Sequence, residues 1–417
     1  MDATGSRAAD VLIQEGKVAT VGSKVSSFPA GTVVLDASGC LVAPGLVDLH
    51  THLREPGREE AETVETGARA AALGGYTTVV AMPNTEPAID SAAVVRQVLD
   101  LGESACCDVR VAGAITVGRK GTQLAPMAEM ARLGVTIFTD DGSGVQDARL
   151  MRRAMEYASA LGVTLAQHCE DASLAGGGHM HEGEWSSRLG IPGQPAEAEE
   201  LMVMRDLALA RLTGAKVHFL HLSTAGSLAM VRGAKGSGLA VTAEVAPHHF
   251  TLTDEAVRSY DPVFKVNPPL RTAADVAAVK AALADGTADA IATDHAPHPQ
   301  ETKEAPFDQA PPGMVGLETA LGLSLTELEI PIERVLALLC WQPAAIAGLL
   351  GEHGGPIAVG RPANLCVIDP TEKWVVDPAA LASRSRNTPY AGKPLVGKVR
   401  HTVLRGEPVV IGGEAQR

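Results

Sequence analysis

The stretch LVDLHTH, residues 46–52, runs from a short apolar segment into two histidines separated by one residue. Seven similar short runs follow it, at residues 77–82, 109–114, 136–140, 164–168, 216–222, 241–247 and 290–294. Ala- and Leu-rich stretches with a helical pattern lie between most of them, and several close on a glycine that suits a helix C-terminus. Apolar strands that alternate with helices indicate a parallel sheet covered on both faces. Eight such units predict an α/β protein with a (β/α)8 barrel over residues 46–355.

The two ends of the chain follow a different pattern. Residues 1–45 and 356–417 contain strand-and-turn segments without helices, and each is too short to fold alone. We therefore expect them to pair as one small β-sandwich beside the barrel. Two long loops, the Gly-rich stretch 172–195 and the Pro-rich stretch 296–313, are predicted to act as functional lids. His179 and His181 in the first loop are expected to face solvent.

The composition argues against several classes of partner. The chain has 417 residues, with 35 basic and 49 acidic side chains and a formal net charge of -14, which disfavours nucleic acid and anionic membranes. The segment 1–16 has no apolar signal-peptide core, and no later run resembles a membrane span. Six cysteines, at positions 40, 106, 107, 169, 340 and 366, fit neither a zinc knuckle nor a disulfide framework. We expect a cytoplasmic protein whose partner is a small molecule.

Metal-ligating residue types gather where the predicted strands end, which is where the active site of such a barrel lies. They are His50, His52, the pair Asp140–Asp141, His168, His221 and Asp294. A single histidine at a strand end is ordinarily a hydrogen-bonded rim residue, but chance does not account for convergence from five strands. Imidazole and carboxylate are the ligands of zinc-type ions. With one aspartate of the pair counted, six ligands exceed the needs of one catalytic zinc, so we infer two metals bridged by a carboxylate and a hydroxide.

The same residues resemble a known group of enzymes. A His-x-His pair on strand one, with histidines on strands five and six and an aspartate on strand eight, is similar to the amidohydrolase superfamily. The phrases GLVDLHTHLREPG (45–57), AMPNTEPAID (81–90), FTDDGSGVQ (138–146), KVNPPLR (265–271) and IATDHAPH (291–298) resemble dihydroorotases of the larger bacterial class. The resemblance covers nearly the whole chain. It implies reversible, metal-dependent cyclisation of N-carbamoyl-L-aspartate to L-dihydroorotate in de novo pyrimidine (UMP) biosynthesis.

The resemblance also implies a division of the ligands between two Zn2+ ions per subunit. His50, His52, Asp141 and Asp294 would hold the buried ion, and Asp141, His168 and His221 the outer one, with Asp141 and hydroxide as bridges. Related hydantoinases and allantoinases use a carboxylated lysine at the end of strand four, where this chain has none. The resemblance assigns the bridge to Asp141, because the DDG phrase (140–142) aligns that way with the family. A strand alternates its side chains, so Asp140 is then expected to have a structural role. Asp294 is expected to act as general base and then general acid.

A carboxylate site for the substrate is predicted beside the metals. Arg54, two residues after His52, offers a bidentate fork suited to a carboxylate, although a rim salt bridge is the alternative. By resemblance, Asn84 and His298 complete that site. Asn267 and the Pro312–Gly313 backbone would contact the ring, where turn chemistry beside proline is the alternative for both asparagines.

Two other functions stay open on the sequence. One is a different cyclic amidohydrolase, a hydantoinase or an allantoinase, against which the Asp141 bridge and the carboxylate site argue. The other is a dihydroorotase-like subunit that scaffolds aspartate carbamoyltransferase, against which the complete ligand set argues. The resemblance also leaves open a complex of an active dihydroorotase with that transferase, because some enzymes of the larger class form one. We expect a homo-oligomer, a dimer.

Overall fold

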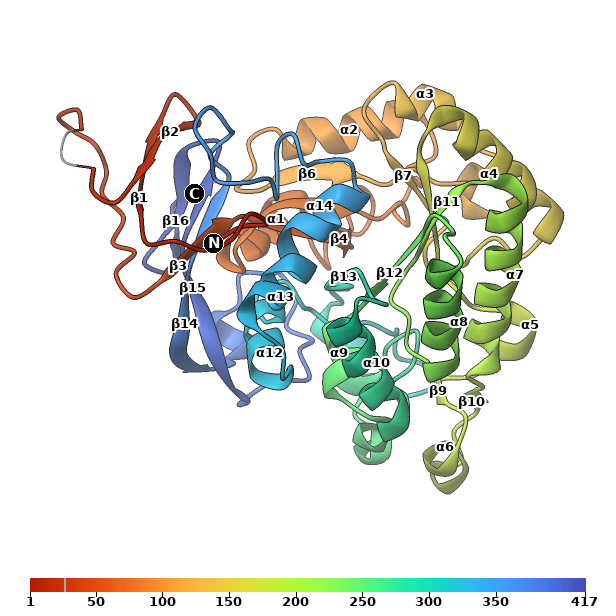
Figure 1. Ribbon diagram of the computed structural model, residues 1–417. Coiled ribbons are helices and arrows are strands. Elements are labelled where there is room, and N and C mark those ends of the chain that lie inside the picture. Colours follow the sequence, from red (N-terminus) through yellow and green to blue (C-terminus); the bar gives the residue numbers. More distant parts are fainter. Residues whose placement is uncertain (26–27) are drawn as a thin grey trace.

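Eight parallel strands form a closed barrel in the computed structural model, which describes residues 1–25 and 28–417 (Figure 1). The strands are β4 (Leu46–Thr51), β5 (Tyr76–Ala81), β6 (Asp108–Val111), β7 (Ile137–Phe138), β8 (Thr164–Gln167), β11 (Lys216–Phe219), β12 (Val241–Val245) and β13 (Ala290–Ile291). They pair as β4-β5-β6 and as β13-β12-β11-β8-β7. Parallel bridges between Gly113 and Phe138 and between Thr51 and His295 join the two groups into one ring. The predicted barrel and all eight of its strands are confirmed.

Helices cover the outside of this ring. They are α1 (Val64–Leu73), α2 (Ala92–Gly102), α3 (Met127–Ala131), α4 (Ala148–Leu161), α7 (Glu197–Thr213), α8 (Ala225–Gly236), α9 (Pro247–Thr251), α10 (Ala273–Asp285), α12 (Ala320–Glu327) and α13 (Ile332–Leu336). A π-turn at Ala337–Trp341 then leads to α14 (Gln342–Ile346), which lies at one end of the ring. The side chains of Asp147 and Thr224 cap the first turns of α4 and α8. Gly162 and Gly214 end α4 and α7 in the left-handed conformation that favours glycine, as the sequence predicts.

The interior of the barrel is apolar and is closed by a helix. Leu46 of β4 faces outward, whereas Val47 and Leu49 face the interior. These two side chains pack against Ala344 in α14 and Ala347 just after it. Because this end of the barrel is filled, the polar residues collect at the opposite, carboxyl end of the strands.

The two ends of the chain build one antiparallel sheet in the order β17-β16-β15-β14-β3. Its strands are β3 (Leu41–Pro44), β14 (Leu365–Val375), β15 (Pro394–Leu404), β16 (Glu407–Ile411) and β17 (Glu414–Ala415). A hairpin of β1 (Asp10–Gln14) and β2 (Lys17–Gly22) packs on it through Val18, Leu365 and Val403. This small β domain agrees with the expected sandwich, and Figure 1 shows both termini in it. The bounds 1–45, 46–355 and 356–417 remain our proposal for the domains.

The two long loops contain short elements that the sequence did not indicate. The first holds α5 (Ala172–Ala175), β9 (Met180–His181), α6 (Glu184–Leu189) and β10 (Gly193–Gln194), with β9 and β10 parallel. The second holds α11 (Gln300–Lys303). The Nζ atom of Lys265 donates to the carbonyl oxygen of Phe307 at 2.8 Å and so anchors the second loop. Their role as lids remains a prediction. No helix in the described ranges is long and apolar enough to cross a membrane.

Candidate metal centre

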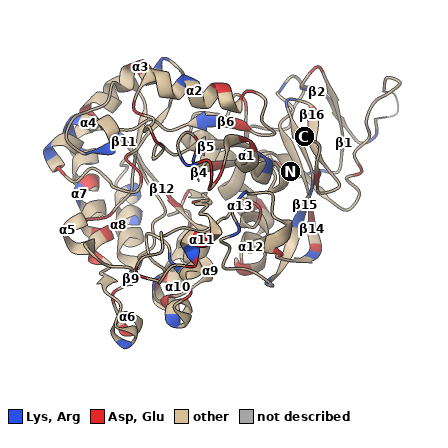
Figure 2. Ribbon diagram, turned by 180° about the vertical axis from the view of Figure 1, so that it is seen from behind, with Lys and Arg blue, Asp and Glu red and all other residues tan. Residues whose placement is uncertain are grey.

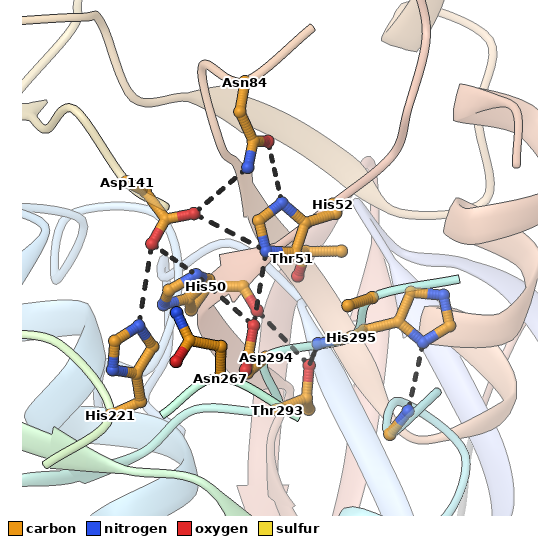
Figure 3. Close-up of polar contacts among 12 residues, drawn as sticks. His50, Thr51, His52, Asn84, Asp141, His221, Asn267, Thr293, Asp294 and His295 are labelled. Atoms are coloured by element: carbon orange, nitrogen blue, oxygen red, sulfur yellow. Dashed lines mark hydrogen bonds and ion pairs between the residues drawn. The ribbon is translucent and has the colours of Figure 1, made fainter. Parts of the chain in front are cut away.

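The strand ends bring His50, His52, Asp141 and Asp294 into one buried cluster (Figure 3). The Nε2 atom of His50 lies 3.4 Å from Asp141 Oδ1 and 3.5 Å from Asp294 Oδ1. The Nε2 atom of His52 lies 3.6 Å from Asp141 Oδ2 and 3.3 Å from Asp294 Oδ1. Two ligands about 2.0–2.2 Å from one tetrahedral zinc-type ion lie roughly 3.3–3.6 Å apart. These separations therefore suit a shared cation.

His168 and His221 stand on the other side of Asp141. The Nδ1 atom of His168 and the Nε2 atom of His221 each lie 3.6 Å from Asp141 Oδ1 and 3.0 Å from each other. All six expected ligands thus meet, with Asp141 between the two sets of histidines. Of three compact ligand groups within the described residues, two lie in this cluster, namely His50–His52–Asp294 and His50–Asp141–His221. His50 belongs to both, whereas the sequence-based division placed it with the buried ion alone.

The donor chemistry of this cluster fits a divalent metal. Among the residues that the structure describes, His50 Nε2 is buried without a hydrogen-bond partner although carboxylate oxygens face it. Burial acts to raise the pKa of Asp141, but His50, His168 and His221 outweigh it and hold that pKa well below its ordinary value. Burial acts in the same direction on Asp294, and nearby histidines again bring its pKa below the ordinary value. Two buried carboxylates among four imidazoles are the oxygen and nitrogen ligands that a zinc-type ion takes.

Backbone conformation directs three of the expected site residues. Arg54, His221 and Asp294 have φ values of 63°, 32° and 47°, a region that non-glycine residues rarely adopt. Each such residue costs about 1–3 kcal/mol and persists only where the surrounding structure holds it. Their occurrence after the strand ends indicates that the fold tolerates this cost in stability because it directs the three side chains into the site.

The adjacent aspartates after β7 point in different directions. Asp140 Oδ1 accepts hydrogen bonds from the backbone N–H groups of Ile115 and Thr116 at 2.9 and 3.0 Å. Asp140 therefore ties the loop after β6 to the end of β7, while Asp141 faces the histidines.

A buried acid that the sequence analysis missed supports His50. The Nδ1 atom of His50 donates to Glu244 Oε1 at 2.9 Å, and Nε2 of His218 donates to Glu244 Oε2 at 3.0 Å. All three side chains are fully buried. A ligand histidine is oriented by the partner of its other ring nitrogen, so Glu244 fixes His50 with Nε2 toward the carboxylates.

Replacing Glu244 by glutamine is expected to weaken metal binding about 10- to 100-fold, because an amide holds the His50 ring less firmly than a carboxylate does. Titration of the metal-free protein with zinc against a competing chelator measures this change. Asp289→Asn is the matched control, because Asp289 accepts from the backbone N–H of Ala243, beside Glu244 on β12, at 2.9 Å and belongs to none of the ligand groups. Equal losses in both variants would show that Glu244 acts only through general stability.

Asn84, an expected substrate contact, also bridges two expected ligands. Its Oδ1 accepts from His52 Nδ1 at 2.8 Å and its Nδ2 donates to Asp141 Oδ2 at 3.2 Å (Figure 3). The amide thus orients His52 and stabilises the charge of Asp141 from the rim of the centre.

Arg54 is a buried cation whose hydrogen bonds go to neutral groups. Its Nε donates to the carbonyl oxygen of Pro297 at 3.2 Å, and its Nη2 lies 3.4 Å from His298 Nε2. Burial lowers the pKa of Arg54 to about 10, so the guanidinium remains charged at neutral pH. In the described ranges, no carboxylate oxygen lies within 4.0 Å of the guanidinium nitrogens of Arg54. A buried cation without a counter-charge is suited to an anionic ligand.

The Pro312–Gly313 segment lies next to this cation. His298 Nε2 is 2.9 Å from the carbonyl oxygen of Pro312, and Asn387 Nδ2 donates to the carbonyl oxygen of Gly313 at 3.1 Å. Asn387, which the sequence analysis did not single out, thereby fixes the backbone that was expected to contact the ring.

Asn267 is oriented by a second missed acid. Its Nδ2 donates to Glu170 Oε2 at 2.7 Å, and Glu170 also lies 3.6 Å from His168 Nε2. Among the described side chains, Asn267 Oδ1 is buried and unpaired. The carboxylate selects the amide orientation that leaves this oxygen as a free acceptor.

The expectation that His181 faces solvent is wrong. His181 is buried, and its Nδ1 lies 3.1 Å from Nη1 of buried Arg271. Arg271 Nε also donates to Ser223 Oγ at 3.0 Å, and the backbone N–H of Ser223 donates to Glu199. The network joins the first long loop to the turn that follows His221. Histidine spacing alone gave no sign of this network, because its members come from distant segments.

Comparison with known proteins identifies the family to which the chain belongs. A family described as Dihydro-orotase-like matches residues 39–227. A protein of Streptomyces coelicolor named dihydroorotase is 52% identical, covering 98% of this chain and 97% of its own length. The dihydroorotase of Pelotomaculum thermopropionicum is also 52% identical, covering 96% of this chain and 94% of its own. The chain belongs to the dihydroorotase family.

Solved structures confirm the fold class. L-hydantoinase (dihydropyrimidinase) from Arthrobacter aurescens superposes with a TM-score of 0.88 at 26% identity, covering 98% of this chain and 94% of that one. Membership of the dihydroorotase family and the two ligand groups together indicate a metal cofactor.

Proposed function

We propose that this member of the dihydroorotase family interconverts N-carbamoyl-L-aspartate and L-dihydroorotate with two zinc ions per subunit. The observation that carries the proposal is the buried cluster of six ligand side chains, with Asp141 at its centre, beside the uncompensated cation of Arg54. The cluster suits metal-assisted hydrolysis of an amide, and the cation suits a substrate that carries a carboxylate. A hydantoin or allantoin ring has no such carboxylate, so neither alternative substrate uses Arg54.

We assign the proton transfer of the reaction to Asp294. Bound divalent ions would lower the pKa of water and polarise a carbonyl group. During hydrolysis, the Asp294 carboxylate accepts the proton of the attacking water and then donates it to the leaving ring nitrogen. During cyclisation the protonated carboxyl group begins the reverse sequence. His248 Nε2 lies 3.9 Å from Asp294 Oδ2, and burial lowers the pKa of His248 to about 4, which keeps this neighbour neutral.

The remaining residues position the substrate. Arg54, with Asn84 and His298, would hold its carboxylate away from the ligand cluster. The free Oδ1 atom of Asn267 is suited to accept a hydrogen bond from an N–H group of the ring, and the Pro312–Gly313 backbone closes the same side.

The proposal is tested by a substrate panel. Zinc-loaded protein is expected to consume dihydroorotate and to cyclise carbamoyl-aspartate, to leave hydantoin and allantoin unchanged, and to lose essentially all turnover with a chelator. Re-addition of zinc should restore the activity. Turnover of hydantoin or allantoin alone would replace the proposed substrate. Inactivity that aspartate carbamoyltransferase reverses would support the proposed complex with that enzyme, and inactivity that persists would favour a scaffold.

A further inference from the structure

Arg119 is a cation near the metal centre that the proposed reaction does not use. It lies in the segment that connects β6 to α3, two elements that Figures 1 and 2 both show along one edge of the barrel beside α2. The residue ends the 3-10 turn Val117–Arg119 and is half-buried. Its φ of 57° falls in the left-handed region, which is unfavourable for an arginine and persists only where the surrounding structure holds it.

The guanidinium of Arg119 reaches the turn that follows β7. Its Nη2 atom donates to the backbone carbonyl oxygen of Asp141 at 2.5 Å and to Ser143 Oγ at 3.3 Å. In the part of the chain that the structure describes, no carboxylate oxygen lies within 4.0 Å of the guanidinium nitrogens of Arg119. Arg119 therefore holds the backbone of Asp141 and leaves its carboxylate free to face the histidines.

Asp140 joins the same two segments in the opposite direction. Its Oδ1 accepts from the backbone N–H groups of Ile115 and Thr116, and its Oδ2 accepts from the hydroxyl group of Thr116. An acid of the turn thus holds the backbone of the segment after β6, while a base of that segment holds the backbone of the turn. Because these contacts act on Asp140 and on Asp141 itself, together they fix the backbone that carries the Asp141 side chain.

Gly142 gives Arg119 access to this backbone. Its φ is 81°, and a Cβ atom at this position would lie 3.4 Å from Arg119 Nη2 and 3.6 Å from Asn84 Nδ2. The guanidinium and the amide therefore lie against the same side of Gly142. Since Asn84 donates to the carboxylate of Asp141 and Arg119 donates to its carbonyl oxygen, the two side chains orient different parts of one residue.

We propose that Arg119 is a positioning residue for the carboxylate that bridges the two metals, an inference that rests on the proposed function. The carboxylate of an aspartate is one methylene group from the backbone, so a shift of the backbone moves both of its oxygens. A carboxylated lysine, the bridge of related hydantoinases, has a longer and more flexible side chain that can adjust. An aspartate bridge needs a fixed backbone instead, and the contact from Arg119 to the carbonyl oxygen of Asp141 supplies it.

The test follows the metal centre without relying on turnover. The metal-free protein is titrated with cobalt(II), which takes the same imidazole and carboxylate ligands as zinc, against a competing chelator. Arg119→Met should weaken binding of the second equivalent about 10- to 100-fold and reduce the magnetic coupling of the two ions in electron paramagnetic resonance. Lys120→Met is the matched control, because it removes the adjacent exposed cation and should change neither quantity.

A milder variant covers the case in which Arg119→Met does not fold, which circular dichroism detects. Arg119→Lys keeps the positive charge, but an ammonium group does not reproduce the planar fork, so binding of the second equivalent should still weaken, toward the lower end of the same range. Wild-type affinity and coupling in the folded Arg119 variants, or equal losses in Lys120→Met, would overturn the inference while the wild-type protein still binds two coupled ions. A wild-type protein that binds a single ion would instead overturn the proposed two-metal function, and this inference with it.

Discussion

Substitution of Asp294 by asparagine is expected to reduce kcat for dihydroorotate by about 10⁴-fold while the protein retains much of its metal. An amide oxygen keeps the size and part of the ligating ability of the carboxylate, but it cannot accept and return the proton. Rates in both directions, together with metal content by elemental analysis, measure the two effects separately.

Glu170→Gln is the matched control for this variant. It also converts a carboxylate in the site to an amide, but Glu170 contacts Asn267 and His168 and not the expected reacting atoms. We expect its effect mainly on KM. A similar collapse of kcat in both variants would assign the effect to loss of negative charge, and near-normal turnover of Asp294→Asn would remove Asp294 from the proton transfer.

Substitution of Arg54 by methionine is expected to lower kcat/KM for dihydroorotate and carbamoyl-aspartate by about 10²- to 10³-fold, mostly through KM. Loss of a buried charge-assisted contact costs several kcal/mol when its partner remains in place, and the substrate carboxylate is that partner. Methionine retains the length of the side chain, which limits the packing change. Steady-state kinetics over a wide substrate range separate KM from kcat.

Arg58→Met provides the comparison for Arg54. Arg58 is exposed and lies four residues further along the chain, so it should change kcat/KM little. A loss of kcat at unchanged KM in Arg54→Met would show that Arg54 supports the fold of the centre and does not bind the carboxylate.

The barrel and the ligand set could be predicted because their signals are local. An apolar strand such as β4 ends in a histidine, and parallel strands place such ends at one rim. The supporting acids could not be predicted. Glu244 lies inside β12 and contacts His50 from a strand 194 residues away, and nothing in the alternation of VTAEVAP marks its partner. The positive φ of His221 is likewise invisible in a sequence without glycine at that position.

Exposure was hardest to infer in the first long loop. Its glycines indicated an open loop, and His181 was accordingly predicted to face solvent. The structure buries His181 against Arg271, an arginine that follows two prolines in the KVNPPLR segment. Burial there depends on a hydrogen-bond network assembled from four segments, and a residue pattern within one segment carries no information about it.

The pairing of β3 with β14 has a consequence for biosynthesis. Leu41 of the edge strand β3 lies opposite Ile368 of β14, so β3 receives its partner only after the whole barrel between them has been translated. At about 5–20 residues per second, the ribosome needs on the order of tens of seconds to supply that partner. During this time β3 presents unpaired backbone groups of the kind that chaperones shield and that promote aggregation. Truncation before β14 is therefore expected to disorder the segment that contains β3, and to appear in cells as poor yield before any effect on catalysis is seen.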